Sequence, residues 1–167
     1  MTVALHMRWV DLAFLHWPVA VEALRPLVPE ALELESFGGA AWVGVTPFRM
    51  TRVRPRFLPP VPTARDFPEL NVRTYVRHRD RAGVYFFSLD AESALAVFAA
   101  RLAVNLPYMR ARMSQRRIGA NVEYASVRTH SGAPPAESPA TYAPSGAPTL
   151  SGLTTAGFKV PAGKRTY

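Results

Sequence analysis

Hydrophobic and polar residues alternate along several stretches of this chain, which is the pattern of β-strands. Leu5–Trp17 mixes aromatic and branched residues and is followed by Pro18, so it predicts a strand rather than a helix. Leu32–Glu35 alternates with period two. A turn at Gly38–Gly39 then predicts a hairpin whose return strand is Ala41–Phe48.

The second half of the chain continues the strand pattern. Glu69–Arg77 alternates most regularly, and one of its two faces is polar. Val84–Leu89 is apolar on both faces, as expected for a strand covered on both sides. Tyr108–Met113 and Ala120–Arg128 alternate again, with a basic turn between them. These strands predict successive hairpins.

Two helices interrupt the strands. The principal one is expected at about 91–105, with Asp90 as its N-cap and Pro107 preventing its continuation. Leu95, Phe98 and Leu102 recur at helical spacing and predict an apolar stripe that faces the core. A shorter helix is expected near 19–28, limited by the proline within it.

Proline-rich segments divide the chain. Pro55–Pro68 holds five prolines and predicts a long irregular loop. Residues 131–148 are rich in Pro, Ala, Ser and Gly and are expected not to order on their own. We therefore expect one domain over 1–130 and a tail over 131–167. Hairpins around two helices indicate an α+β fold with a mostly antiparallel, strongly bent sheet or barrel.

Composition excludes several classes of chemistry. The 167 residues include no cysteine, which rules out disulfides, thiolate metal sites and cysteine nucleophiles. Of the 20 basic residues 18 are arginine, and the two lysines are Lys159 and Lys164. A lysine-type amine nucleophile is thus available only in the tail. No histidine spacing suggests a metal site, no cofactor motif is present, and no stretch approaches a membrane span. We expect a cytoplasmic protein without metal or cofactor.

Five motifs occur together and in a fixed order. They are F-L-H-W-P-V at Phe14–Val19, A-W-V-G-V-T-P-F-R-M at Ala41–Met50, F-P-E-L-N-V-R-T-Y-V at Phe67–Val76, G-V-Y-F-F-S-L-D-A at Gly83–Ala91 and L-P-Y at Leu106–Tyr108. This set resembles the YqjF-like family of uncharacterised bacterial proteins, within the acetoacetate-decarboxylase-like superfamily. The resemblance covers about residues 8–130 and implies a cone-like β-barrel with a central cavity.

The resemblance also marks two positions. Acetoacetate decarboxylases form a Schiff base through a lysine that follows the main helix, and the matching position here is Tyr108. A tyrosine cannot form an imine, so that mechanism is not open to this chain. The cavity glutamate of the decarboxylases corresponds to Glu69. After Pro144 the chain departs from the family pattern, which would be expected of a truncated or frame-shifted tail.

The polar face of Glu69–Arg77 is the principal candidate site. Glu69 and Tyr108 are its catalytic candidates, and Asn71, Arg73 and Tyr75 are its candidates for substrate binding. We expect Glu69 and Arg73 to pair in a cavity with both side chains charged. The alternative is the solvated face of an antiparallel strand. For Tyr108 the alternative is packing beneath the helix, and for His16 packing or a backbone hydrogen bond is favoured over catalysis.

Three functions remain open from the sequence. The first is a barrel cavity that binds, and converts, a small organic acid without a Schiff-base lysine. The second is sequence-independent binding of nucleic acid by the arginine-rich surface. A genome-wide arginine bias is the favoured explanation of that composition, which makes this function the less favoured one. The third is an inactive, truncated family member. Strand edges left open by a truncated tail would be covered by a second copy in a homo-oligomer.

Overall fold

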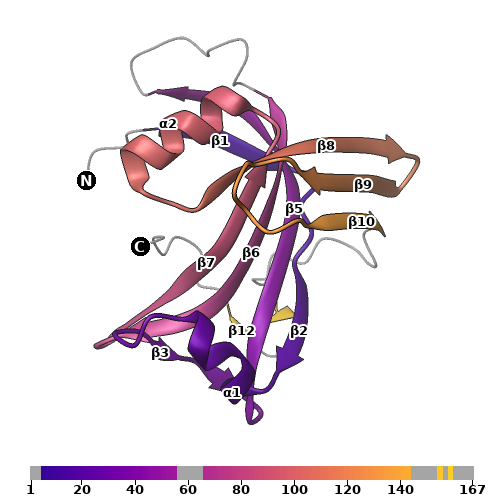
Figure 1. The fold of residues 1–167 in the computed structure, drawn as a ribbon. Helices are drawn as coiled ribbons and strands as arrows, with labels where there is room; N and C mark the ends of the chain where they lie inside the picture. Colours follow the sequence, from indigo (N-terminus) through magenta and orange to yellow (C-terminus); the bar gives the residue numbers. More distant parts are fainter. Residues whose placement is uncertain (1–4, 56–65, 144–153, 156–157, 160–167) are drawn as a thin grey trace. The chain divides into compact units, whose positions relative to one another are not determined.

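Strands make up most of the regular structure. The computed structural model describes residues 5–55, 66–143, 154–155 and 158–159. Seven strands follow one another across the sheet in the order β1 (Leu5–Val10), β5 (Ala40–Pro55), β6 (Phe67–His78), β7 (Arg81–Ala91), β8 (Tyr108–Ile118), β9 (Asn121–Arg128) and β10 (Glu137–Tyr142) (Figure 1). The expected α+β class with a mostly antiparallel sheet is confirmed.

Short strands complete the pairing. β2 (Leu15–Val19) and β4 (Ser36–Phe37) pair with β5, and β3 (Glu33–Leu34) pairs with β6. β11 (Thr154–Thr155) and β12 (Phe158–Lys159) form a separate two-stranded sheet. Among the pairs that we describe, β7 with β8 is parallel. A parallel pair needs a crossover, and α2 (Ala94–Val104) supplies it.

The chain divides into two compact units. The first consists of Met1–Ala13, Thr46–Asn71 and Ser88–Ser145, and the second of Phe14–Val45, Val72–Phe87 and Gly146–Tyr167. Strands β5, β6 and β7 each contribute residues to both units. We describe each unit separately.

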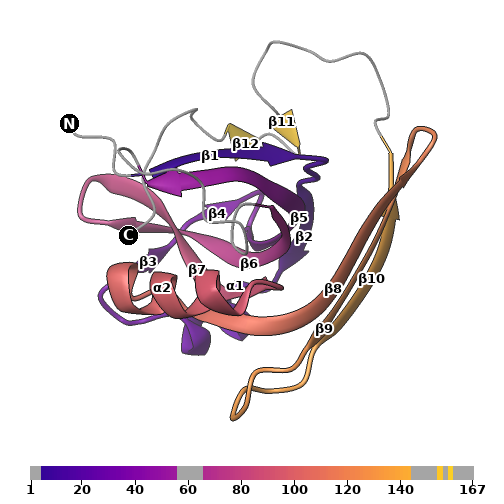
Figure 2. The same cartoon turned by 90° about the horizontal axis from the view of Figure 1, so that it is seen from above.

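The apolar core of the first unit joins sheet and helix. Its buried residues are Phe48, Met50, Phe67, Ala91 and Val97. The Trp9 ring packs on Phe48, with 4.6 Å between ring centroids. β8, β9 and β10 run side by side as an antiparallel ribbon, seen in both views (Figures 1 and 2).

The second unit contains a short helical segment that follows β2. α1 (Val21–Leu24) continues into a 3₁₀ turn at Arg25–Leu27, which confirms a short helical element near 19–28. The Arg25 guanidinium donates to the carbonyl oxygens of Leu32 and Pro29, each at 2.7 Å. The turn before β5 uses Gly38 at φ +61° and Gly39 at φ +80°, as a tight hairpin requires.

The strand expected over Leu5–Trp17 is two strands. β1 ends at Val10 and β2 begins at Leu15. Asp11 has φ +50°, a left-handed conformation that an extended strand does not contain. The single strand was therefore a wrong prediction, because local alternation carries no signal for this backbone reversal.

Helix α2 starts three residues later than predicted. Ser93 rather than Asp90 is its N-cap, since the Ser93 hydroxyl accepts a hydrogen bond from the Ala96 amide at 3.2 Å. The Asp90 carboxylate is bound by Arg128 instead, and Ala91 still belongs to β7. The end at Asn105 agrees with the prediction, because Asn105 adopts the left-handed cap conformation.

The predicted apolar stripe of α2 does not face the core. Leu95, Phe98 and Leu102 are 46, 63 and 73% exposed, whereas Val97 is buried. Arg101 is the one charged residue of this helix. A helix without a polar face gives the apolar pattern no means of selecting the buried side, and the sheet contacts decide it.

Part of the predicted tail belongs to the sheet. β10 pairs with β9 from Glu137↔Val127 to Tyr142↔Val122. The segment after 130 was expected not to order on its own, and β10 is ordered against the edge of β9, which supplies its hydrogen-bond partners. Of the expected loop at Pro55–Pro68, residues 56–65 lie outside the described residues.

We predict that Ser93→Ala destabilises the fold by about 0.5–2 kcal/mol, because the substitution leaves the Ala96 amide without its cap. Chemical denaturation measures the change. Ser114→Ala, at an exposed position on β8, is the matched control and should stay within about 0.5 kcal/mol of the wild type. Equal stability of the two variants would contradict the assignment of the cap.

Candidate functional site

The polar residues of β6 are buried. Glu69, Asn71, Arg73 and Tyr75 are 1, 2, 7 and 4% exposed. Their neighbours on the opposite face, including Leu70 and Val76, are also buried. The alternative of a solvated strand face is therefore wrong. Burying such groups costs free energy, which makes their partners the central question.

Glu69 has its partner in the first unit. The Tyr108 hydroxyl donates to both carboxylate oxygens, at 3.2 and 3.3 Å. Burial raises the pKa of Glu69 to about 8, and the hydrogen bond from Tyr108 acts in the opposite direction. Burial and the nearby Glu69 raise the pKa of Tyr108. Glu69 is thus mostly protonated at neutral pH, and Tyr108 stays a phenol.

Tyr108 both packs against the core and donates a hydrogen bond. Its ring packs against the apolar core of the first unit, and its hydroxyl reaches Glu69. Tyr108 is the first residue of β8, and its pairing with Leu89 of β7 fixes the position of its side chain. The position that carries the lysine in the decarboxylases therefore carries a hydroxyl donor to the glutamate.

The expected pair of Glu69 and Arg73 is wrong. The two residues are four positions apart on β6, which separates their Cα atoms by about 13 Å. No salt bridge joins them in the described part of the chain. Glu69 is moreover not held as a charged carboxylate, because its raised pKa favours the neutral acid.

A closed ion pair lies elsewhere in the first unit. Arg128 donates to both oxygens of Asp90, at 3.0 and 3.1 Å, and to the Ser88 hydroxyl at 2.9 Å. Burial raises the pKa of Asp90, and Arg128 opposes that shift. Within the described residues Asn71 Oδ1 and Thr46 Oγ1 are buried with no hydrogen-bond partner. No motif or spacing in the sequence marks Asp90 and Arg128 as a pair.

Arg73 is the buried cation of the second unit. Its guanidinium carbon lies 5.3 Å from the centroid of the Phe14 ring, a cation–π contact. The Arg73 side chain also bonds to Tyr75. Among the described residues no carboxylate forms a salt bridge with Arg73, and its Nε has no hydrogen-bond partner. Within the described residues, Arg73 is therefore a buried positive charge without a carboxylate counter-ion.

His16, which the sequence pattern presented as an isolated histidine, also belongs to this group of side chains. His16 Nε2 and the Tyr75 hydroxyl are 2.5 Å apart. Burial and the charge of Arg73 lower the pKa of His16, so it is neutral. His16 pairs with Gly44 across β2 and β5. A Cβ at Gly44 would stand 3.2 Å from His16 Nε2, so the G in A-W-V-G-V was the available signal.

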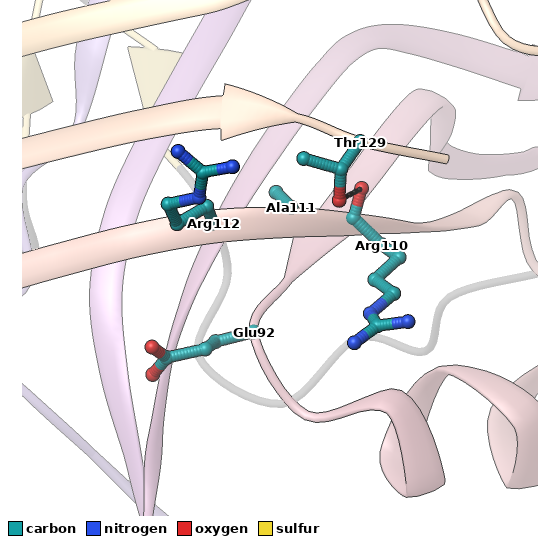
Figure 3. A pocket seen from close by; sticks show the side chains of 5 residues that line it. All are labelled: Glu92, Arg110, Ala111, Arg112 and Thr129. Carbon is teal, nitrogen blue, oxygen red and sulfur yellow. Dashed lines mark hydrogen bonds between the residues drawn. The ribbon is translucent and has the colours of Figure 1, made fainter. Parts of the chain in front are cut away.

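A surface pocket of about 450 Å³ lies in the first unit. Glu92, Arg110, Ala111, Arg112 and Thr129 line it. Figure 3 shows that Arg110 and Arg112 come from β8, Glu92 from the segment before α2, and Thr129 from just beyond β9. Its charged side chains are exposed, in contrast with the buried groups of β6.

The described residues hold neither a cluster of metal-ligating side chains nor a helix suited to a membrane. No three His, Asp or Glu side chains gather there to hold a metal ion. No helix in that part of the chain combines the length and apolarity needed to cross a membrane.

Comparison with known proteins gives one similar curated chain. It is the uncharacterized protein YqjF of Bacillus subtilis (strain 168), with 50% identity over 120 residues. The match covers 72% of this chain and 50% of YqjF. The chain therefore spans about half the length of its curated relative.

Solved structures share the fold at low sequence identity. Acetoacetate decarboxylase from Legionella pneumophila matches with a TM-score of 0.58 and 14% identity, covering 72% of this chain and 44% of that chain. An acetoacetate decarboxylase-like enzyme from Sphingomonas wittichii RW1 matches with a TM-score of 0.59 and 16% identity. This match covers 77% of this chain and 55% of that enzyme. The enduracididine biosynthesis enzyme MppR complexed with pyruvate matches with a TM-score of 0.56 and 14% identity. This match covers 75% of this chain and 52% of MppR.

The chain therefore has the acetoacetate-decarboxylase-like fold. A family model described as an uncharacterized conserved protein matches residues 6–156, which is most of the chain. Together with the identity to YqjF, this match establishes that the protein belongs to the uncharacterised DUF2071 family.

Proposed function

We propose that this protein binds a small organic acid whose carboxylate pairs with Arg73. The observation that carries the proposal is the buried guanidinium without a carboxylate partner among the described residues. An uncompensated buried charge is costly, and an anion removes that cost. Guanidinium groups hold carboxylates through two parallel hydrogen bonds, which the unpartnered Nε can help to form.

His16 and Tyr75 suit the same ligand. Both lie beside Arg73 in the second unit and carry no charge at neutral pH. A neutral imidazole and a phenol orient a bound acid through hydrogen bonds without competing for the guanidinium. MppR, which shares the fold, was solved with pyruvate, itself a small organic acid. That structure supports the ligand class.

The Glu69 centre of the first unit is a separate candidate for acid–base chemistry. Glu69 is a buried acid with a pKa of about 8, and Tyr108 donates to it. A group with such a pKa can give and take a proton near neutral pH, which is what general acid–base chemistry needs. The bacterial cytoplasm is the setting that we propose, and no imine is involved.

Small carboxylates should stabilise the protein through Arg73. We expect propionate and pyruvate to raise the melting temperature relative to sodium chloride of equal ionic strength. A ligand at about 100 times its Kd adds about 2.7 kcal/mol. Arg73→Met should abolish this rise and keep or increase the stability without acid, because it removes an uncompensated buried charge.

Arg77→Met is the matched control for that experiment. Arg77 lies on the same strand, is exposed and pairs with Glu35, so its loss should leave the effect of propionate unchanged. A propionate-induced rise of equal size in Arg73→Met and in the wild type would refute the proposal.

The raised pKa of Glu69 predicts a specific pH dependence of stability. The folded protein holds the Glu69 proton up to about pH 8, whereas the unfolded chain releases it near 4.5. The contribution of Glu69 to the free energy of unfolding should therefore be greatest below about pH 4.5. It should fall by at most about 1.4 kcal/mol per pH unit as the pH rises to about 8, and then level off. Urea titrations at several pH values, wild type against Glu69→Gln, isolate this contribution.

In that comparison Glu123→Gln serves as the control, since Glu123 is exposed and pairs with Arg116. Its pH profile should parallel that of the wild type. A constant difference between wild type and Glu69→Gln from pH 4.5 to 8 would show that Glu69 is ionised throughout and would contradict the assignment.

The absence of lysine before position 159 predicts no covalent amine chemistry on that part of the chain. Borohydride treatment in the presence of acetoacetate should leave residues 1–158 unmodified. Peptide mass spectrometry checks the result, with an acetoacetate decarboxylase as the positive control. An adduct within 1–158 would be the contrary outcome.

A further inference from the structure

The β8–β9 hairpin carries buried polar atoms that neither the core nor the Glu69 centre explains. Within the described residues, Gln115 Nε2 and Oε1, the Tyr124 hydroxyl and the Ser126 hydroxyl have no hydrogen-bond partner. Tyr124 and Ser126 are 3 and 2% exposed, and both atoms of the Gln115 amide are buried.

The three side chains form one patch. Gln115 is directly paired with Tyr124 across the two strands, and Ser126 is paired with Met113. Residues two apart on a strand share a face, so Gln115, Tyr124 and Ser126 all point to the same side of the hairpin. Met113 on that face is buried, whereas Arg112 and Ser114 on the other face are exposed.

A patch of this kind is expensive for a fold. Each buried polar group left without a partner costs about 1–3 kcal/mol, and such groups are rare in native proteins. Apolar residues at the same positions would pack without that cost. Their retention in one patch points to a bound partner that supplies the hydrogen bonds.

None of the three side chains of the patch is charged, although the charge of Arg49 acts on Tyr124 and opposes the rise of its pKa. The guanidinium of Arg128, on the same strand as Tyr124, forms a salt bridge with Asp90. Arg49 donates a hydrogen bond to the backbone carbonyl oxygen of Gln115 at 3.0 Å. Burial, with the charges of Tyr142, Glu69 and Asp90, raises the pKa of Tyr124. Tyr124 is therefore a neutral hydrogen-bond donor, and Glu69, in the same unit, contributes to its raised pKa.

We propose that Gln115, Tyr124 and Ser126 form a neutral hydrogen-bonding subsite that receives an uncharged hydroxyl- or carbonyl-bearing group. The subsite extends the Glu69 centre of the proposed function and does not require Arg73. An amide offers both donor and acceptor, and two hydroxyls can turn to either role. This donor set fits a hydroxylated or oxo-substituted ligand better than a plain alkyl chain.

Two uncharged probes test the subsite. Lactamide and propionamide differ by one hydroxyl group, and neither needs a cationic partner. Saturation-transfer NMR with the wild-type protein should show lactamide bound more tightly than propionamide. Tyr124→Phe and Gln115→Met should lower that preference by about 2–10-fold, the value of one neutral hydrogen bond. Ser114→Ala, on the exposed face, should keep it.

Thermal melts of the same variants without probe complete the test. Tyr124→Phe and Gln115→Met should melt at or above the wild-type temperature, since each removes a buried atom without a partner. A decrease of about 2–4 °C or more, roughly 1 kcal/mol for a chain of this size, would show that these atoms serve the fold and would overturn the proposal.

Binding outcomes separate this inference from the proposed function. No preference for lactamide in the wild type, or an undiminished preference in the variants, overturns the subsite. Arg73→Met should bind lactamide as the wild type does. Absence of propionate binding in the wild type, with the lactamide preference intact, would count against Arg73 as a carboxylate site and in favour of the subsite.

Discussion

The burial of both faces of β6 is the constraint on which the rest of the structure depends. An antiparallel strand with one polar face usually turns that face to water. Here Glu69 and Arg73 are almost completely buried on the polar face, while Leu70 and Val76 are buried on the other. The protein must therefore satisfy a carboxyl group and a guanidinium without solvent, and it does so in different ways.

The two solutions have different chemical consequences. Glu69 avoids the cost of a buried charge by keeping its proton, and Tyr108 donates a hydrogen bond to it. Arginine cannot lose its charge in this way. Arg73 instead stays charged against Phe14 and Tyr75, with the imidazole of His16 kept neutral beside Tyr75. One strand therefore holds a buried acid that keeps its proton and a buried cation.

Much of this architecture could be predicted from residue patterns. Alternation located β6, β8 and β9, and the proline after α2 marked where that helix ends. The pattern could not show that β6 is covered on both sides, because alternation describes a strand and not its surroundings. The cap at Ser93 and the exposed stripe of α2 depend in the same way on tertiary contacts, namely the capture of Asp90 by Arg128 and the packing of Val97.

The candidate site was predicted only in part. Family resemblance brought Tyr108 and Glu69 into one hypothesis, and the hydrogen bond between them agrees with it. The pair of Glu69 and Arg73 failed on strand geometry alone, since four positions are too far for contact. His16 reaches Tyr75 across 59 residues of sequence, a contact that a single chain's pattern does not encode.

The measurement closest to the central claim is the ionisation of Glu69 itself. Carbon-13 NMR of the Glu69 side-chain carboxyl, assigned by comparison with Glu69→Gln, follows its protonation between pH 3 and 10. A polar β6 face enclosed in the protein interior predicts a midpoint near pH 8. A midpoint near the ordinary value of 4.5 would mean that Glu69 is solvated, and would contradict the account.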